Sequence, residues 1–222
     1  METDVITTNK TLNSFFKNVS GLPFLVGGSY ALALYLQQLK KSDFNQNSEK
    51  YIVYPNDIDI FVACEGVEDF SIKLDTFFSG SDKIQLLRSY EYGPEYGEGN
   101  RFDRISGDIV SQRPEDAEEF SKSIIRTDTY IVGVSIRIQL VAILCDDKKD
   151  FVKIMAKIVD IPTNVFVKYS FEYDEESESE ECKLILFPQK TLVEGIERGS
   201  FDSSKICEAR RRKYEERGFT FL

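Results

Sequence analysis

Apolar residues recur at regular spacing through the first part of the chain. Within residues 7–19 they stand three or four positions apart, which predicts a short amphipathic helix. A brief apolar run at 23–26 ends in Gly27 and Gly28, and a stretch rich in alanine and leucine follows at 29–41. This order predicts a strand, a glycine turn and a helix.

The polar segment 40–50 is interpreted as an exposed loop, followed by a short strand at 51–54. A second strand-like pattern comes next. Residues 57–62 alternate aspartate with apolar residues and then become wholly apolar, as expected for a strand with one end at the surface. Because successive strand side chains point to opposite faces, Asp57 and Asp59 are predicted to share one face.

The remaining elements are predicted in the same way. Apolar spacing indicates helices, and runs of β-branched residues indicate two hairpins, of which the first turns near Gly133. Glycine and tyrosine between 89 and 107 favour irregular hairpins or a loop over the sheet. The predicted helices are 67–78, 151–159 and a basic one at 203–222, and the predicted hairpin strands are 129–134 with 136–144 and 164–173 with 183–187.

These elements predict an α+β fold, a mixed β-sheet with flanking helices and a C-terminal β-hairpin plus helix. A chain of 222 residues is long enough for one well-buried core, so we expect a single domain over 1–222, with a core at about 8–145 and an extension at about 150–222. No stretch approaches the roughly 18 to 20 apolar residues that span a bilayer, so no membrane partner is expected. The N-terminus lacks the features of a secretory signal, and we expect a cytoplasmic protein.

Composition narrows the possible chemistry. The chain has no histidine, which excludes hydrolases built on an imidazole base or ligand and leaves mainly carboxylate chemistry with a hard divalent cation. Its net charge is −10, but residues 172–181 carry seven acids and no base, so the remaining chain is at −3. We interpret this acidic run as the solvated tip of the second hairpin.

Two segments together form a candidate triphosphate and metal site. Glycines allow the backbone to approach a phosphate, and the amides at a helix start present donors and the positive end of the helix dipole. Ser29 adds a hydroxyl donor. Asp57 and Asp59 project to one side about 6.5 to 7 Å apart along the strand, which suits carboxylates that share divalent cations.

The segments LVGGSYAL and NDIDIFV resemble the signature of the polymerase β-type nucleotidyltransferase superfamily, in which a Gly-Ser turn precedes an acid-x-acid strand. IRIQLVAIL, NVFVKY and RRRKYEERGF are similar to segments of nucleotidyltransferase-like proteins of large DNA viruses, which would place the protein in the host cytoplasm. The resemblance implies that Gly28 and Ser29 contact the phosphates of an NTP such as ATP and that Gly27 shapes the turn. It implies that Asp57 and Asp59 bind Mg²⁺ or Mn²⁺.

The sequence departs from the superfamily pattern at two points. Residues 30–56 separate Ser29 from Asp57 by 27 positions, where the superfamily usually has about a dozen, but a surface insertion is tolerated because closure entropy grows slowly with length. Catalytic members carry a third acid on a neighbouring strand, and that position here holds Gln139. An amide cannot accept the proton of the attacking hydroxyl. Asp108 and Asp160 are alternative acids.

Three functional hypotheses therefore stand. The chain transfers a nucleotidyl group to a nucleic-acid end, a protein or a small molecule; it is an inactive relative in nucleotide binding, regulation or assembly; or it is an interaction protein whose Asp-Ile-Asp is accidental. The basic segment 210–213 with Arg217 fits either phosphate binding or a charged helix face. Tyr90, Tyr92 and Tyr96 fit either base stacking or hairpin packing.

Overall fold

The computed structural model describes residues 12, 15–42, 57–79, 84–111, 123–131, 137–146, 151–158, 161–173, 180–192, 212, 215 and 216. The predicted strand 51–54, most of the acidic run and nearly all of the basic helix 203–222 lie outside these residues. Within them, no helix is both long enough and apolar enough to cross a membrane.

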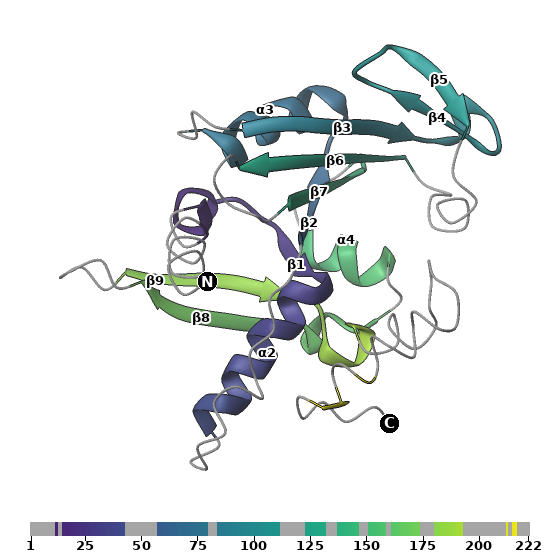
Figure 1. Cartoon of the computed structure of the whole chain (residues 1–222). Helices are drawn as coiled ribbons and strands as arrows, with labels where there is room; N and C mark the ends of the chain where they lie inside the picture. Colours follow the sequence, from purple (N-terminus) through teal and green to yellow (C-terminus); the bar gives the residue numbers. More distant parts are fainter. Residues whose placement is uncertain are drawn as a thin grey trace.

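One large sheet organises the described chain, with its strands in the order β5-β4-β3-β6-β7-β2-β1-β9-β8 (Figure 1). The helices α2, α3 and α4 pack on it or extend from it, and the 3-10 turns η2 and η4 lie in connections. The strands are β1 (Leu25–Gly27), β2 (Asp57–Cys64), β3 (Ile84–Tyr92), β4 (Asn100–Asp103), β5 (Asp108–Ser111), β6 (Ile124–Ile131), β7 (Arg137–Leu144), β8 (Val167–Tyr173) and β9 (Glu180–Leu186). The helical elements are α2 (Gly28–Ser42), α3 (Val67–Phe78), α4 (Phe151–Ile158), η2 (Pro94–Tyr96) and η4 (Thr163–Val165).

The sheet is mixed, which confirms the predicted α+β class. β2 runs parallel to β7, and β1 runs parallel to β9, whereas the other neighbouring strands are antiparallel. The two predicted hairpins are present as β6 with β7 and β8 with β9. Because β9 lies beside β1, the hairpin of the C-terminal extension continues the same sheet as the core.

One face of the central strands is apolar. Ile58, Ile60 and Val62 of β2 project to this face and are fully buried. The apolar side of the predicted N-terminal helix packs here, as do Phe70 and Phe77 of α3. The shared cluster also includes Leu12, Phe15, Phe16, Val19, Ala31, Leu32, Ile125, Ile138, Leu140 and Ala142.

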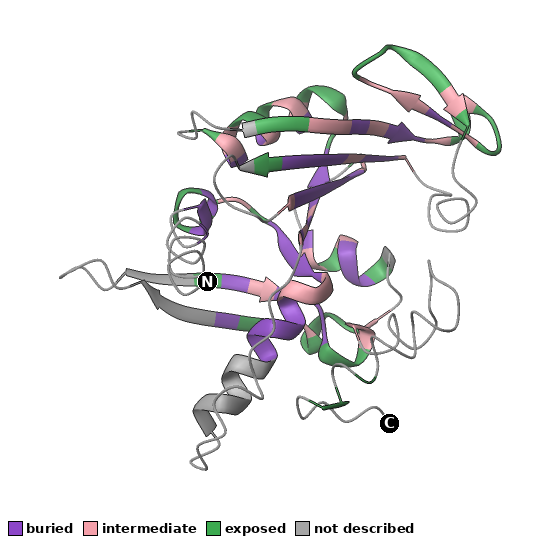
Figure 2. Cartoon of the chain, in the orientation of Figure 1, coloured by how far each residue is buried: buried purple, intermediate pink, exposed green. Residues whose placement is uncertain are grey.

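The opposite face is apolar at one end and polar at the other. Ala63 and Val141 lie at the apolar end, where Phe151 and Met155 of α4 cover them. At the other end the same strands carry Asp57, Asp59, Arg137 and Gln139, beyond the second apolar cluster. Figure 2 shows buried ribbon along the central strands and more exposed ribbon at β4 and β5. The candidate site therefore occupies the polar end of this face.

The segment 89–107 forms antiparallel hairpins within the sheet, so the first of its two predicted alternatives is confirmed and the loop over the sheet was wrong. β3 begins at Ile84 and pairs with β6, and β4 and β5 continue the sheet to its edge. These outer strands alternate polar and apolar residues only weakly, because several of their charged side chains have partners on neighbouring strands. The same feature hid the first half of β6, which begins at Ile124 rather than at 129.

Candidate functional site

The glycine turn joins β1 directly to α2. Gly28 opens the helix with a φ of 59°, a left-handed conformation that favours glycine. A Cβ atom added to Gly28 would lie 1.8 Å from Oδ2 of Asp59. The absence of a side chain at Gly28 therefore leaves the space that the Asp59 carboxylate occupies.

Gly27 has a different local constraint. It is the last residue of β1 and lies opposite Asp59 in the antiparallel pair with β2. A Cβ atom at Gly27 would lie 2.9 Å from the Phe61 ring and 3.0 Å from the Phe187 ring. Those two rings pack edge to face at 4.9 Å between centroids. Gly27 thus allows the aromatic packing beneath the turn.

The first predicted metal ligand, Asp57, lies at the start of β2 beside the helix opening. The Ser29 hydroxyl lies 3.5 Å from its Oδ1, at the outer limit of a hydrogen bond. Nη2 of Arg137 lies 2.5 Å from its Oδ2. The Asp57 and Arg137 side chains are each 27% exposed, so the ion pair is only partly screened by water.

The second predicted ligand, Asp59, has a different environment. In the described part of the chain its carboxylate makes no hydrogen bond or ion pair. Burial and then the charge of Asp57 raise the pKa of Asp59 to about 7, although Arg126 and Arg137 act in the opposite direction. Burial therefore favours the protonated form of Asp59 below about pH 7.

A row of residues in register crosses the sheet at Asp59. It runs Gly27, Asp59, Gln139, Asp128 and Arg88, on strands β1, β2, β7, β6 and β3. Gln139 thus lies on the strand next to the acid pair, at the position predicted from the sequence. Its side chain is buried, and its Nε2 donates to Oδ1 of Asp128 at 2.8 Å. The Gln139 amide is therefore already engaged away from Asp59.

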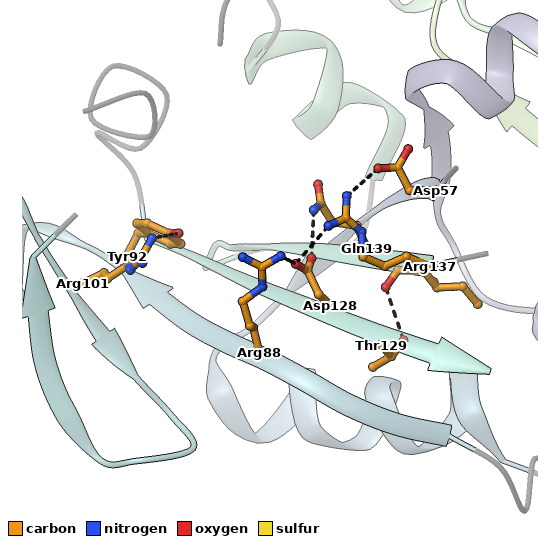
Figure 3. A network of polar contacts seen from close by, with 9 residues as sticks. Asp57, Arg88, Tyr92, Arg101, Asp128, Thr129, Arg137 and Gln139 are labelled. Atoms are coloured by element: carbon orange, nitrogen blue, oxygen red, sulfur yellow. Dashed lines mark hydrogen bonds and ion pairs between the residues drawn. The ribbon is translucent and has the colours of Figure 1, made fainter. Parts of the chain in front are cut away.

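Asp128 is the buried centre of a charge network that the sequence did not reveal. Besides the Gln139 amide, Nη2 of Arg88 lies 2.9 Å from its Oδ2 and Nη1 of Arg137 lies 3.8 Å from the same atom. Figure 3 shows Arg137 between Asp57 and Asp128, with Arg88 on the far side of Asp128. The hydrogen bond to Asp57 and the charges of both carboxylates raise the pKa of Arg137 above its ordinary value, although burial alone would lower it.

Of the two alternative third acids, Asp108 lies away from the site. Asp108 is exposed on the edge strand β5, and four strands lie between β5 and β2, so the prediction that it reaches the acid pair was wrong. Asp160 lies outside the described residues. Among the side chains that the structure does describe, no three acids or cysteines gather closely enough to hold a metal on their own. The described part of the site offers two carboxylates, and a bound cation would take its other ligands from water or nucleotide.

The tyrosines of β3 take part in packing between strands. The Arg101 guanidinium lies 3.8 Å from the centroid of the Tyr90 ring and donates to the Tyr92 hydroxyl at 3.3 Å. Tyr96 stacks on Phe102 at 5.7 Å. These contacts agree with the packing interpretation rather than base stacking. Of the basic segment, only Arg212 is described, and it is exposed.

Comparisons with known proteins identify no relative. No family model, curated protein or solved structure matches the chain. Function is therefore inferred from the geometry of the site.

Proposed function

We propose that the chain is a nucleotidyltransferase-like protein of the polymerase β type that binds a nucleoside triphosphate with Mg²⁺ or Mn²⁺ at the start of α2. One observation carries this proposal. Two segments separated by 27 residues meet so that Ser29 reaches Asp57 at 3.5 Å and Gly28 leaves space for the Asp59 carboxylate. A glycine-opened helix beside two carboxylates of one strand combines phosphate donors with ligands for a hard cation.

Each residue has a specific role in this proposal. The backbone amides at Gly28 and Ser29, with the Ser29 hydroxyl, bind phosphate oxygens at the positive end of the α2 dipole. Asp57 and Asp59 hold the cation, and their position at the polar end of the sheet leaves them uncovered by α4. The cation, when bound, neutralises charge on the triphosphate and acidifies an attacking hydroxyl. We place this action in the cytoplasm, of the host cell if the protein is viral.

A second candidate is a nucleotide-binding relative without transfer activity. Gln139 favours it, because its amide donates to Asp128 where the superfamily's catalytic members carry a third carboxylate. Gln139 cannot accept a proton, and Asp128 is buried with two arginines and an amide around it. Such a protein would use the same site for regulation or assembly.

The test separates binding from transfer. Thermal shift should show a midpoint that rises with ATP in the presence of Mn²⁺, and incubation with labelled NTPs and mixed nucleic-acid, protein and small-molecule acceptors should show any transfer. Asp57→Asn and Asp59→Asn should abolish both effects, whereas the exposed Asp108→Asn is the matched control. Binding without transfer favours the second candidate. If no NTP and metal shift the midpoint, the site does not bind nucleotide and both candidates fail.

A further inference from the structure

Arg137 occupies an unusual position between two carboxylates of different strands. One guanidinium nitrogen contacts Oδ2 of Asp57 at 2.5 Å, and the other lies 3.8 Å from Oδ2 of Asp128. The first distance is a close charge-assisted contact, whereas the second is at the limit of an ion pair. Arg137 thus holds Asp57 closely and has a second carboxylate within reach.

A cation and Arg137 compete for the same carboxylate. Oδ2 of Asp57 is taken by the guanidinium, and a divalent ion at about 2.0 to 2.2 Å from the other oxygen would stand beside that positive group. Two positive groups on one carboxylate repel each other strongly in a partly buried site. Binding of a cation therefore favours the release of Arg137 from Asp57.

Asp128 is the carboxylate that can receive the displaced guanidinium. It is fixed by the Gln139 amide at 2.8 Å and by Arg88 at 2.9 Å, so it stays in place when Arg137 moves. Arg137 is partly exposed, and a side chain of its length can move its guanidinium by about 1 Å through small rotamer changes. The guanidinium needs only to shorten the 3.8 Å distance between Nη1 of Arg137 and Oδ2 of Asp128.

We propose that Arg137 is a positioning residue that occupies Asp57 in the metal-free site and transfers to Asp128 when a cation binds, so that metal and triphosphate bind together. This inference rests on the proposed function. After the transfer, two arginines share the single charge of Asp128, which leaves positive charge beside the new cation. A triphosphate supplies the compensating negative charge, whereas metal alone does not. Metal alone should consequently bind weakly, and each ligand should strengthen the other by the same factor.

The test measures Mn²⁺ binding with and without a non-hydrolysable ATP analogue, by the EPR signal of free Mn²⁺ at pH 8. Arg137→Met removes the competing charge and should tighten binding of Mn²⁺ alone at least tenfold, while the strengthening by nucleotide becomes smaller. Arg137→Lys keeps a charge and should stay close to the native protein. Arg104→Met is the matched control, because it also removes one positive charge and Arg104 pairs with Glu91 outside the Asp57 and Asp128 network. Its affinity for Mn²⁺ alone should change less than threefold.

Several results would distinguish the inference from the proposed function. If Arg137→Met binds Mn²⁺ alone no more tightly than the native protein, while Asp57→Asn abolishes Mn²⁺ binding, the transfer of Arg137 is refuted and the metal site stands. An equal gain in Arg104→Met would also refute it, since the effect would then be general electrostatics. If no variant binds Mn²⁺ with or without nucleotide, the proposed function fails and this inference with it. Arg137→Gln provides a second neutral variant if circular dichroism shows that Arg137→Met is unfolded.

Discussion

Gly28 gives a direct test of how closely the helix start and the acid strand meet. In Gly28→Ala the new Cβ would lie 1.8 Å from Oδ2 of Asp59, where ordinary contact begins at 3.4 Å. The overlap is 1.6 Å, the difference of those two distances, so the Asp59 side chain must leave its position. The left-handed backbone alone costs alanine about 1 to 2 kcal/mol, and overpacking adds about 1 to 3 kcal/mol. We expect Gly28→Ala to lower the free energy of unfolding by about 2 to 5 kcal/mol.

A double-mutant cycle separates the two contributions. In an Asp59→Ala background the overlap is gone, so Gly28→Ala should cost only the backbone term of about 1 to 2 kcal/mol. Gly107→Ala is the matched control, because Gly107 also has a positive φ, of 80°, and no atom lies within 4 Å of its added Cβ. Urea unfolding followed by far-UV circular dichroism suits the measurement, since the chain has no tryptophan.

The outcome that would refute this reasoning is a cost of Gly28→Ala that is the same in both backgrounds. The carboxylate of Asp59 would then not lie against Gly28. The proposed site would lose the close approach that brings the glycine turn to the acid pair. A cost near zero in the native background would refute the left-handed conformation of Gly28 as well.

Three further predictions follow from the described contacts. In the folded protein Asp59 has a pKa of about 7 and its ordinary value is 3.8, so between these pH values the folded state keeps a proton that the unfolded state has lost. The free energy of unfolding should therefore fall as pH rises from 4 to 7, by at most about 1.4 kcal/mol per pH unit. A urea-unfolding series should show that Asp59→Asn loses this slope. Gln139→Glu replaces a hydrogen-bond donor 2.8 Å from Asp128 with a like charge. It should lower the free energy of unfolding by about 1 to 3 kcal/mol at pH 8 and by less at pH 5. Equal losses at both pH values would contradict the contact between Gln139 and Asp128. Phe77→Ala should lower the free energy of unfolding by about 3 to 5 kcal/mol in the same assay, because Phe77 is buried and its ring lies 5.6 Å from the ring of Phe24. Ile72 is 60% exposed, so the control Ile72→Ala should change that free energy by less than about 0.5 kcal/mol.

Elements with strong apolar periodicity were predictable from the sequence. α3 has the predicted bounds, and β2, β7 and α4 differ from their predicted ranges by only a few residues. In these elements the buried face sets the spacing of the apolar residues. The first half of β3 and the start of β6 were missed, and the bounds of the hairpin strands at 89–107 were not placed, because charge pairs such as Arg88 with Asp128 replace apolar contacts on one face. Polar pairs between strands leave no period that distinguishes such a strand from a loop.

The site was predictable only in part, for a similar reason. The sequence brought forward Gly28, Ser29, Asp57 and Asp59, and the structure places them together. Arg137 could have been found, since it lies two positions before Gln139 and therefore on the same face. Asp128 could not, because its position opposite Gln139 depends on the strand register, and a slip of one residue would turn it to the other face.

The register also determines what Asp128 can do. One strand, β7, lies between Asp128 and Asp59 in the row, and neighbouring strands lie about 4.8 Å apart, so the two backbones are roughly 9 to 10 Å apart. Carboxylates that share one Mg²⁺ each place an oxygen about 2.1 Å from it. Two aspartates that project in parallel from backbones this far apart cannot both bring an oxygen so close to one ion. Asp128 therefore does not supply a third ligand to a cation held by Asp57 and Asp59. Its charge instead holds Arg88 and the Gln139 amide, and it gives Arg137 an alternative partner to Asp57.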